Sequence, residues 1–154
     1  MNIAIRRMTL EDVPTVHAID TLSFSLPWPE SSFRFELTGN PVSRSWVAES
    51  GGGIAAMLVL WLIIDEAHIA TIATHPDFRR QGIGERLMMA ALLSARAEGA
   101  AHAFLEVRAG NSNAMSLYKK YGFIVAGVRP RYYKDNNEDA ILMNLEDLNS
   151  LEAA

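Results

Sequence analysis

The longest uninterrupted apolar segment of the chain runs from Ile54 to Ile64 and contains eleven residues. A membrane-spanning helix needs about twenty apolar residues, so this segment is too short to cross a bilayer. A strand that is covered on both faces is apolar at successive positions. The segment therefore predicts a central strand with packed layers on both sides. The glycines at 51–53 predict a turn that joins it to an antiparallel strand over 46–49.

Helical and extended patterns alternate along the rest of the chain. Strands are expected over 2–7, 46–49, 54–64, 67–74, 101–108, 123–128 and 140–145, and helices over 9–24, 29–37, 82–98 and 113–121. Because Pro14 is unfavourable inside a helix, the first helix is expected to start nearer Asp12, with Thr9 and Asp12 as a capping box. The resulting order, β-α-α-β-β-β-α-β-α-β-β, is typical of a layered α/β (α+β) domain.

Length, charge and cysteine content narrow the class of protein further. The 154 residues suit one domain over 1–148, followed by a short tail over 149–154. The chain has no cysteine, which excludes disulfides and thiolate metal sites, and its histidines show no His-x-x-x-His spacing, so no metal is expected. The net charge of −4 disfavours a broad basic surface for nucleic acid, and the N-terminus lacks a secretion signal. We therefore expect a cytoplasmic monomer that contacts neither nucleic acid nor membrane.

A strand, a turn and a glycine-containing helix start follow one another over residues 71–87. Gly82 and Gly84 stand where the helix begins, so a phosphate could approach unpaired backbone N–H groups there without meeting a side chain. Positive charge is supplied by Arg79, Arg80 and Arg86. The segment predicts an anion site, although a plain glycine loop before a helix is the alternative. It is not a dinucleotide fingerprint, because Leu87 stands where the third glycine belongs.

Together with three downstream segments, this turn resembles the motifs of the GNAT acetyltransferases. The matching segments are Arg79-x-x-Gly82-x-Gly84, Leu105-Glu106-Val107-Arg108, Asn111-x-x-Ala114 and Leu117-Tyr118-x-x-Tyr121-Gly122-Phe123. A narrower similarity, to the ribosomal-protein-alanine N-acetyltransferases of this family, rests on Pro27-Trp28, Leu105-Glu106-Val107-Arg108-Ala109, and Arg131-Tyr132-Tyr133 before Glu138-Asp139-Ala140. The resemblance covers nearly the whole chain. It implies a central mixed, mostly antiparallel sheet of about six or seven strands with helices on both faces.

The same resemblance implies that acetyl-CoA is the acetyl donor. Backbone groups of Ile72, Ala73 and Thr74 would bind the pantetheine arm, and Asn111 would bind the cofactor near the next helix. The pyrophosphate would be held, mainly through N–H groups, by Arg79, Arg80, Gln81, Gly82, Ile83, Gly84 and Glu85. Because Glu85 is an acid in a phosphate-facing turn, its side chain is expected to point away.

Glu106 is the candidate general base, and Tyr118 is the candidate general acid, of a direct transfer. An α-amine with a pKa near 8 is about one-tenth neutral at pH 7, so it needs little help from a base. Glu106 lies in an apolar strand, where desolvation would make it a stronger base; the alternative is an exposed glutamate on the other face of the sheet. By the resemblance, Tyr118 lies near the cofactor sulfur and protonates the leaving thiolate. Its helical spacing with Ala114, Leu117 and Tyr121 equally fits a core residue.

Three aromatic residues, Trp28, Tyr132 and Tyr133, are expected on loops that line a peptide groove, with packing of these loops onto the sheet as the alternative. Arg108 is expected to pair with an acid on a neighbouring strand. The resemblance favours transfer to the N-terminal alanine of a ribosomal protein. A lysine or small-molecule amine as acceptor remains an alternative, as does a non-catalytic acyl-CoA-binding module.

Overall fold

In the computed structural model, which describes residues 2–151, seven strands form one sheet in the order β1-β2-β3-β4-β5-β7-β6. The strands are β1 (Ile3–Arg7), β2 (Ser43–Ser50), β3 (Gly53–Ile63), β4 (Glu66–Thr74), β5 (His102–Arg108), β6 (Ile124–Tyr133) and β7 (Glu138–Leu145). The helices are α1 (Val13–Ser23), α2 (Glu30–Thr38), α3 (Ile83–Ala97) and α4 (Ser112–Lys120). The described residues also include three short 3-10 helices: η1 (Leu10–Asp12), η2 (Pro76–Phe78) and η3 (Leu148–Ser150). The predicted order of elements is confirmed.

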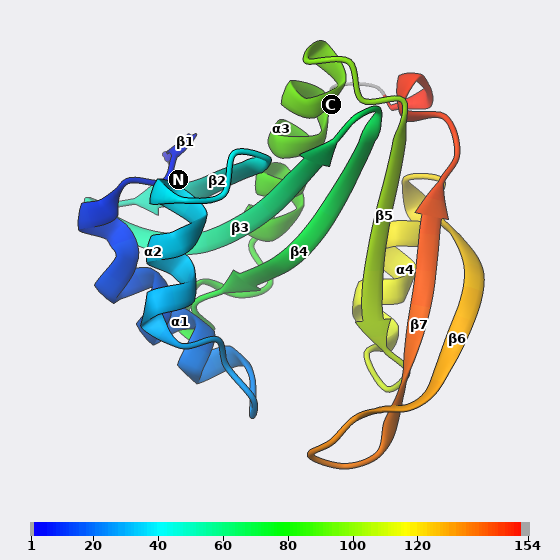
Figure 1. Cartoon of the computed structure of the whole chain (residues 1–154). Helices are drawn as coiled ribbons and strands as arrows, with labels where there is room; N and C mark the ends of the chain where they lie inside the picture. The colour runs from blue at the N-terminus through cyan, green and yellow to red at the C-terminus, as the bar shows by residue number, and fades with distance from the viewer. Residues whose placement is uncertain (1, 152–154) are drawn as a thin grey trace.

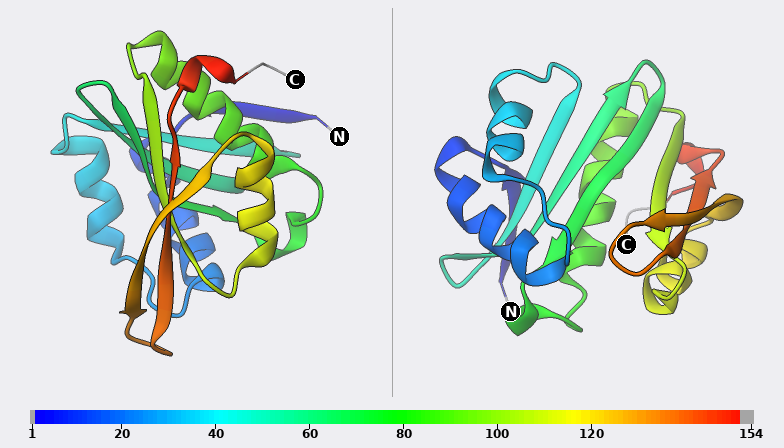
Figure 2. Two further views of the ribbon diagram at one scale, coloured as in Figure 1. Left: turned by 90° about the vertical axis from the view of Figure 1, so that its right-hand side faces the viewer. Right: turned by 60° about the horizontal axis from the view of Figure 1, so that its bottom comes forward.

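The predicted central strand is confirmed as β3, in which residues 55–60 are all fully buried. Helices α1 and α2 cover one face of the sheet, and α3 and α4 cover the other (Figures 1 and 2). Met57 and Val59 pack with the α1–α2 layer, whereas Leu58 and Leu60 pack with the α3–α4 layer. Because successive side chains of a strand point to opposite faces, the apolar run supplies both cores at once.

All neighbouring strands are antiparallel except β4 and β5, which are parallel. This parallel pairing joins only Glu66–His68 to His102–Phe104. Beyond these residues β4 stays paired with β3, and β5 with β7, and the two strands diverge as a V (Figure 1). Inside the V, the facing edges of β4 and β5 therefore offer backbone groups that the described sheet does not use.

The first helix begins where the proline predicts. Pro14 is the second residue of α1, and η1 precedes the helix, so the expected continuous helix from residue 9 is wrong. Asp12 accepts a hydrogen bond from the Thr9 N–H at 2.7 Å, as the expected capping box requires. Helix α2 begins at Glu30, with Pro29 as its N-cap.

The C-terminal part of the chain departs from expectation in two places. Strand β6 continues through Tyr133, so Tyr132 and Tyr133 lie on a strand, and their expected loop position is wrong. The expected tail begins at residue 149, but η3 continues to Ser150 and Leu151 is buried, so residues 149–151 belong to the packed part of the domain. The Leu151 carbonyl accepts a hydrogen bond from Arg96 at 2.8 Å. Residues 152–154 lie outside the described part of the chain.

None of the helices within residues 2–151 combines the length and hydropathy that a membrane span requires.

Truncation of a core residue under the sheet is expected to destabilise the fold strongly. Leu92 of α3 is fully buried, so Leu92→Ala should lower the free energy of unfolding by about 2–5 kcal/mol, through lost burial and the cavity it leaves. Urea denaturation measures this change. Leu22→Ala is the control, because Leu22 is 57% exposed and its loss should change stability by no more than about 0.5 kcal/mol. Equal effects of the two substitutions would contradict the described packing.

Candidate active site

A cleft of about 530 Å³ occupies the V between β4 and β5. Its walls come from residues 69–72 of β4 and 105–108 of β5, and from the loop that joins α1 to α2. Asn111 and Tyr118 close one side, and residues at the β6–β7 turn close another. Five segments that are distant in the sequence thus meet around one cavity, which is the usual form of a small-ligand site.

The cleft brings together part of the predicted site. The residues of that set that line it are Trp28, Ile72, Glu106, Asn111, Tyr118 and Tyr133. Tyr132 is not among the lining residues; its ring lies under the Arg129 guanidinium, 5.4 Å away. Ala73, Thr74 and the predicted anion turn over 79–85 continue from the end of β4, outside the cleft lining. The predicted residues therefore form two adjoining regions, a cleft and a turn.

Glu106 points to the cleft face of β5. Its neighbours Leu105 and Val107 are buried on the opposite face. The expected desolvation of Glu106 is wrong, because its side chain is 34% exposed and one carboxylate oxygen lies 3.4 Å from Arg129 Nη1. The alternative that the sequence offers for Glu106 is an exposed position on the other face of the sheet. In the structure Glu106 is both partly exposed and part of the cleft wall.

Tyr118 serves the core and the cleft at once. It is 7% exposed and packs against Phe123, with the ring centroids 5.8 Å apart. Burial raises the pKa of the Tyr118 phenol to about 12. The tyrosine is therefore a protonated donor throughout the neutral range, at a point where α4 meets the cleft.

Asn111 has a local structural task that the sequence analysis missed. Its side-chain oxygen accepts a hydrogen bond from the Ala114 N–H at 3.2 Å, which makes it the N-cap of α4. One end of the amide is thus used by the helix, and the NH₂ end can still donate into the cleft.

The anion turn has the backbone that the glycine pattern predicts. Gly82 has φ +75° and precedes the first residue of α3, and Arg80 also has positive φ. A side chain at Gly84 would place its Cβ 3.0 Å from the Thr74 hydroxyl, so the glycine lets α3 approach the end of β4. The first N–H groups of this 15-residue helix have no intrahelical partner and face the turn.

Two charged residues of this turn have protein partners. Arg79 Nε donates to the Thr74 carbonyl at 3.1 Å, and its NH₂ group donates to the Ser23 hydroxyl at 3.2 Å. Glu85 pairs with Lys120 of α4 at 3.2 Å, which offsets its negative charge. Arg79 consequently ties the turn to both β4 and α1.

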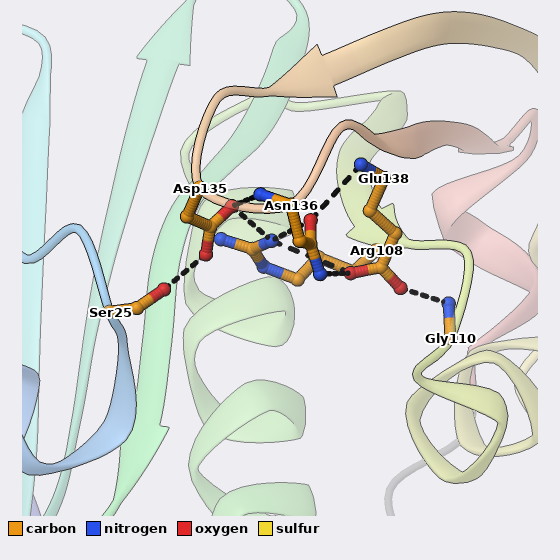
Figure 3. Close-up of polar contacts among 6 residues, drawn as sticks. All are labelled: Ser25, Arg108, Gly110, Asp135, Asn136 and Glu138. Atoms are coloured by element: carbon orange, nitrogen blue, oxygen red, sulfur yellow. Dashed lines mark hydrogen bonds and ion pairs between the residues drawn. The ribbon is translucent and has the colours of Figure 1, made fainter.

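A polar network at the open end of the V was largely missed by the sequence analysis (Figure 3). Arg108 pairs with Glu138 of the neighbouring strand β7 at 3.4 Å, as expected, and also with Asp135 of the β6–β7 turn at 2.9 Å. Asp135 accepts a hydrogen bond from the Ser25 hydroxyl in the α1–α2 loop. The polar residues over 135–138 are the sequence signal for such a network. Their partners Ser25 and Arg108 could not be predicted, because they are distant in the sequence.

Asp20 is a second residue that the sequence analysis missed. It is 1% exposed, and one carboxylate oxygen accepts a hydrogen bond from the Trp28 N–H at 2.7 Å. Its other oxygen is buried without a partner among the described residues, and burial raises the pKa of this carboxyl. Asp20 therefore fixes the backbone of the wall that carries Trp28.

Among residues 2–151, no group of three or more histidine and acidic side chains is arranged to hold a metal ion.

Comparison with known proteins gives consistent results. The profile of the acetyltransferase (GNAT) family matches residues 13–123. The chain is 41% identical over 140 residues to a Bacillus subtilis protein provisionally named a ribosomal protein bS18-alanine N-acetyltransferase, a match that covers 91% of this chain and 93% of the relative. It is 34% identical over 152 residues to the ribosomal protein bS18-alanine N-acetyltransferase of Escherichia coli strain K12, covering 92% of this chain and 95% of that protein. The crystal structure of the Escherichia coli ribosomal-protein-S18-alanine N-acetyltransferase is similar with a TM-score of 0.88 and 31% identity, covering 99% of this chain and 97% of that one.

The burial of Tyr118 is expected to be visible in the ionisation of the tyrosines. The difference between the phenolate absorbance titrations of the wild type and Tyr118→Phe should have its midpoint near pH 12, when recorded directly after a pH jump. Since the folded pKa is above the unfolded value of about 10, the stabilisation by neutral Tyr118 is complete below pH 10 and is lost as the pH rises toward 12. A midpoint near pH 10 would contradict the buried position.

Proposed function

Because the chain belongs to the acetyltransferase (GNAT) family and is an N-acetyltransferase, we propose that it moves acetyl from acetyl-CoA to the α-amine of the N-terminal alanine of a ribosomal protein. The observation that carries the proposal is that one cleft presents Glu106 on a strand and Tyr118 on a helix, opposite a loop that bears Trp28. The names of the two relatives support the choice of acceptor.

The residues around the V fit acetyl-CoA. The unpaired edge of β4 offers backbone groups of Ile72, Ala73 and Thr74 to an amide-bearing arm, and Asn111 adds an NH₂ donor. The start of α3 offers N–H groups beside Gly82 and Gly84, where a diphosphate needs donors and space. The holding residues of the turn would be those from Arg80 to Glu85, while Arg79 keeps the turn in place. When bound, acetyl-CoA supplies the activated acetyl thioester.

Glu106 is proposed to take the proton of the attacking amine, directly or through one water. The amine nitrogen forms a bond to the acetyl carbon, the carbon–sulfur bond breaks, and the amine proton passes to the Glu106 carboxylate. Arg129 lies 3.4 Å from this carboxylate without burying it, since the Glu106 side chain keeps 34% exposure. An α-amine suits such a base, because about a tenth of it is already neutral at pH 7.

Tyr118 is proposed to return a proton to the leaving thiolate. A buried phenol with a pKa of about 12 is fully protonated at neutral pH and donates a hydrogen bond as charge develops on sulfur. Because this phenol is a weaker acid than a thiol with a pKa near 8.5, Tyr118 acts first by donating its O–H to the sulfur. When its proton passes to the leaving thiolate, solvent returns a proton to the phenolate.

Trp28 and Tyr133 are proposed to contact the substrate, because they stand on opposite walls of the cleft. Tyr132 supports Arg129 and so acts on the site indirectly. A ribosomal-protein acceptor would place the reaction in the cytoplasm. The proposal includes a monomer that binds neither nucleic acid nor membrane, in keeping with the net charge of −4.

Removal of either proposed proton carrier is expected to slow transfer while the cofactor still binds. Glu106→Gln should lower kcat by about 10²–10⁴-fold, and Tyr118→Phe should have an effect in the lower part of that range. Thiol release from acetyl-CoA with a free N-terminal alanine peptide measures both, and calorimetric titration with CoA tests binding. Variants that bind CoA and retain full thiol release would remove Glu106 and Tyr118 from the mechanism.

Acceptor class is tested by peptides that differ only at their N-terminus. A peptide with a free N-terminal alanine should be acetylated, and its pre-acetylated counterpart with internal lysines should show no transfer above background. Mass spectrometry locates the added group. Equal transfer to both peptides would favour a lysine acetyltransferase, and binding of acetyl-CoA without transfer to any amine would favour a non-catalytic module.

A further inference from the structure

The two walls of the cleft that face an incoming peptide are tied to each other by one side-chain bond. The Ser25 hydroxyl, in the loop after α1, donates to the carboxylate of Asp135, which is 110 residues further along the chain (Figure 3). Both residues line the cleft. Their bond therefore lies across the open end of the V, and we call the pair the strap.

Asp135 is held in place from its own side of the cleft. Arg108 donates to it at 2.9 Å and lowers the pKa of the Asp135 carboxyl to about 2, so it is ionised throughout the neutral range. The same guanidinium lies 3.9 Å from the centre of the Tyr133 ring. Glu138 accepts hydrogen bonds from the Gly110 N–H and from Asn136, so the β6–β7 turn is anchored to the segment before α4.

Ser25 lies in the α1–α2 loop, and hydrogen bonds on both sides of Ser25 hold this loop in place. The Asp20 carboxylate accepts the Trp28 N–H at 2.7 Å, and the Ser23 hydroxyl accepts a hydrogen bond from Arg79. Ser25 lies between these two fixed points. Each wall is thus held by its own hydrogen bonds, and the Ser25–Asp135 bond joins the two walls.

We propose that Ser25 and Asp135 are specificity-determining residues that set the width available to the first side chain of the acceptor. This inference rests on the proposed function. While the strap is closed, it holds the wall with Trp28 at a fixed separation from the wall with Tyr133, and this separation limits the size of the first side chain that fits between them. Without the strap the walls separate, so larger first side chains are admitted and alanine is positioned less well.

The test uses peptides that are identical except for a first residue of alanine, serine, valine or leucine. The wild type should favour alanine over leucine in kcat/KM by about tenfold or more, which is the discrimination that a size-limited pocket provides. Ser25→Ala removes the strap and leaves Arg108 with Asp135, and it should reduce this preference to about threefold or less. Asp135→Ala should reduce it to the same extent. A substitution that lowers the stability of the protein but keeps the width of the cleft would leave the alanine-to-leucine ratio of kcat/KM unchanged.

Lys134→Ala is the matched control, because Lys134 precedes Asp135 in the same turn and its side chain has no hydrogen bond or ion pair to the described residues. It should keep the wild-type ratio. Hydrogen exchange in residues 23–28 and 133–138 should become faster in Ser25→Ala and stay unchanged in the control, which verifies opening of the strap without requiring activity.

The possible results separate the inference from the function on which it rests. An unchanged alanine-to-leucine ratio in Ser25→Ala overturns the role of the strap and leaves N-terminal acetylation standing. A changed ratio in Asp135→Ala alone also overturns it, because the β6–β7 turn rather than the strap would then control selectivity. Failure of the wild type to acetylate any free N-terminus overturns both.

Discussion

The site depends on the loss of pairing between β4 and β5. Two parallel strands that separate after three residue pairs expose backbone groups which a sheet would normally satisfy. The cost of leaving such groups unpaired is tolerable only where a ligand or water can pair with them. Pairing of β4 with β3 and of β5 with β7 holds both arms of the V, so the opening is built into a rigid sheet.

Several residues near the V use one part of the side chain to stabilise the fold and another part to line or support the site. Tyr118 packs its ring against Phe123 and presents its hydroxyl end to the cleft side of α4. Asn111 caps α4 with its oxygen and keeps its NH₂ group for other donors. Arg79 holds the anion turn to β4 through the Thr74 carbonyl. Because the same side chains stabilise the fold and form the site, a change that loosens their packing also displaces the groups in the site.

Charge in the cleft is arranged in pairs. Glu106 faces Arg129, and Asp135 and Glu138 share Arg108. Hydrogen bonds, Arg108 among their donors, lower the pKa values of Asp135 and Glu138, whereas the buried Asp20 has one oxygen without a partner among the described residues, and burial raises its pKa. The same cleft therefore contains carboxylates in three different environments, and Glu106 is the one that is partly exposed on β5.

Local patterns in the sequence determine the order of elements, the central strand and the glycine turn before α3. The apolar run of β3, the glycines before α3 and the helix caps act over a few residues, so they can be interpreted without knowledge of the rest of the chain. The family motifs likewise name Glu106 and Tyr118. Only the tertiary structure decides that Glu106 is partly exposed beside Arg129, that Tyr132 lies outside the cleft, and that Ser25 meets Asp135. The physical reason is that these contacts join residues from separate strands and loops. Their distances depend on where β4 and β5 part and where β6 ends, and no local pattern encodes either point.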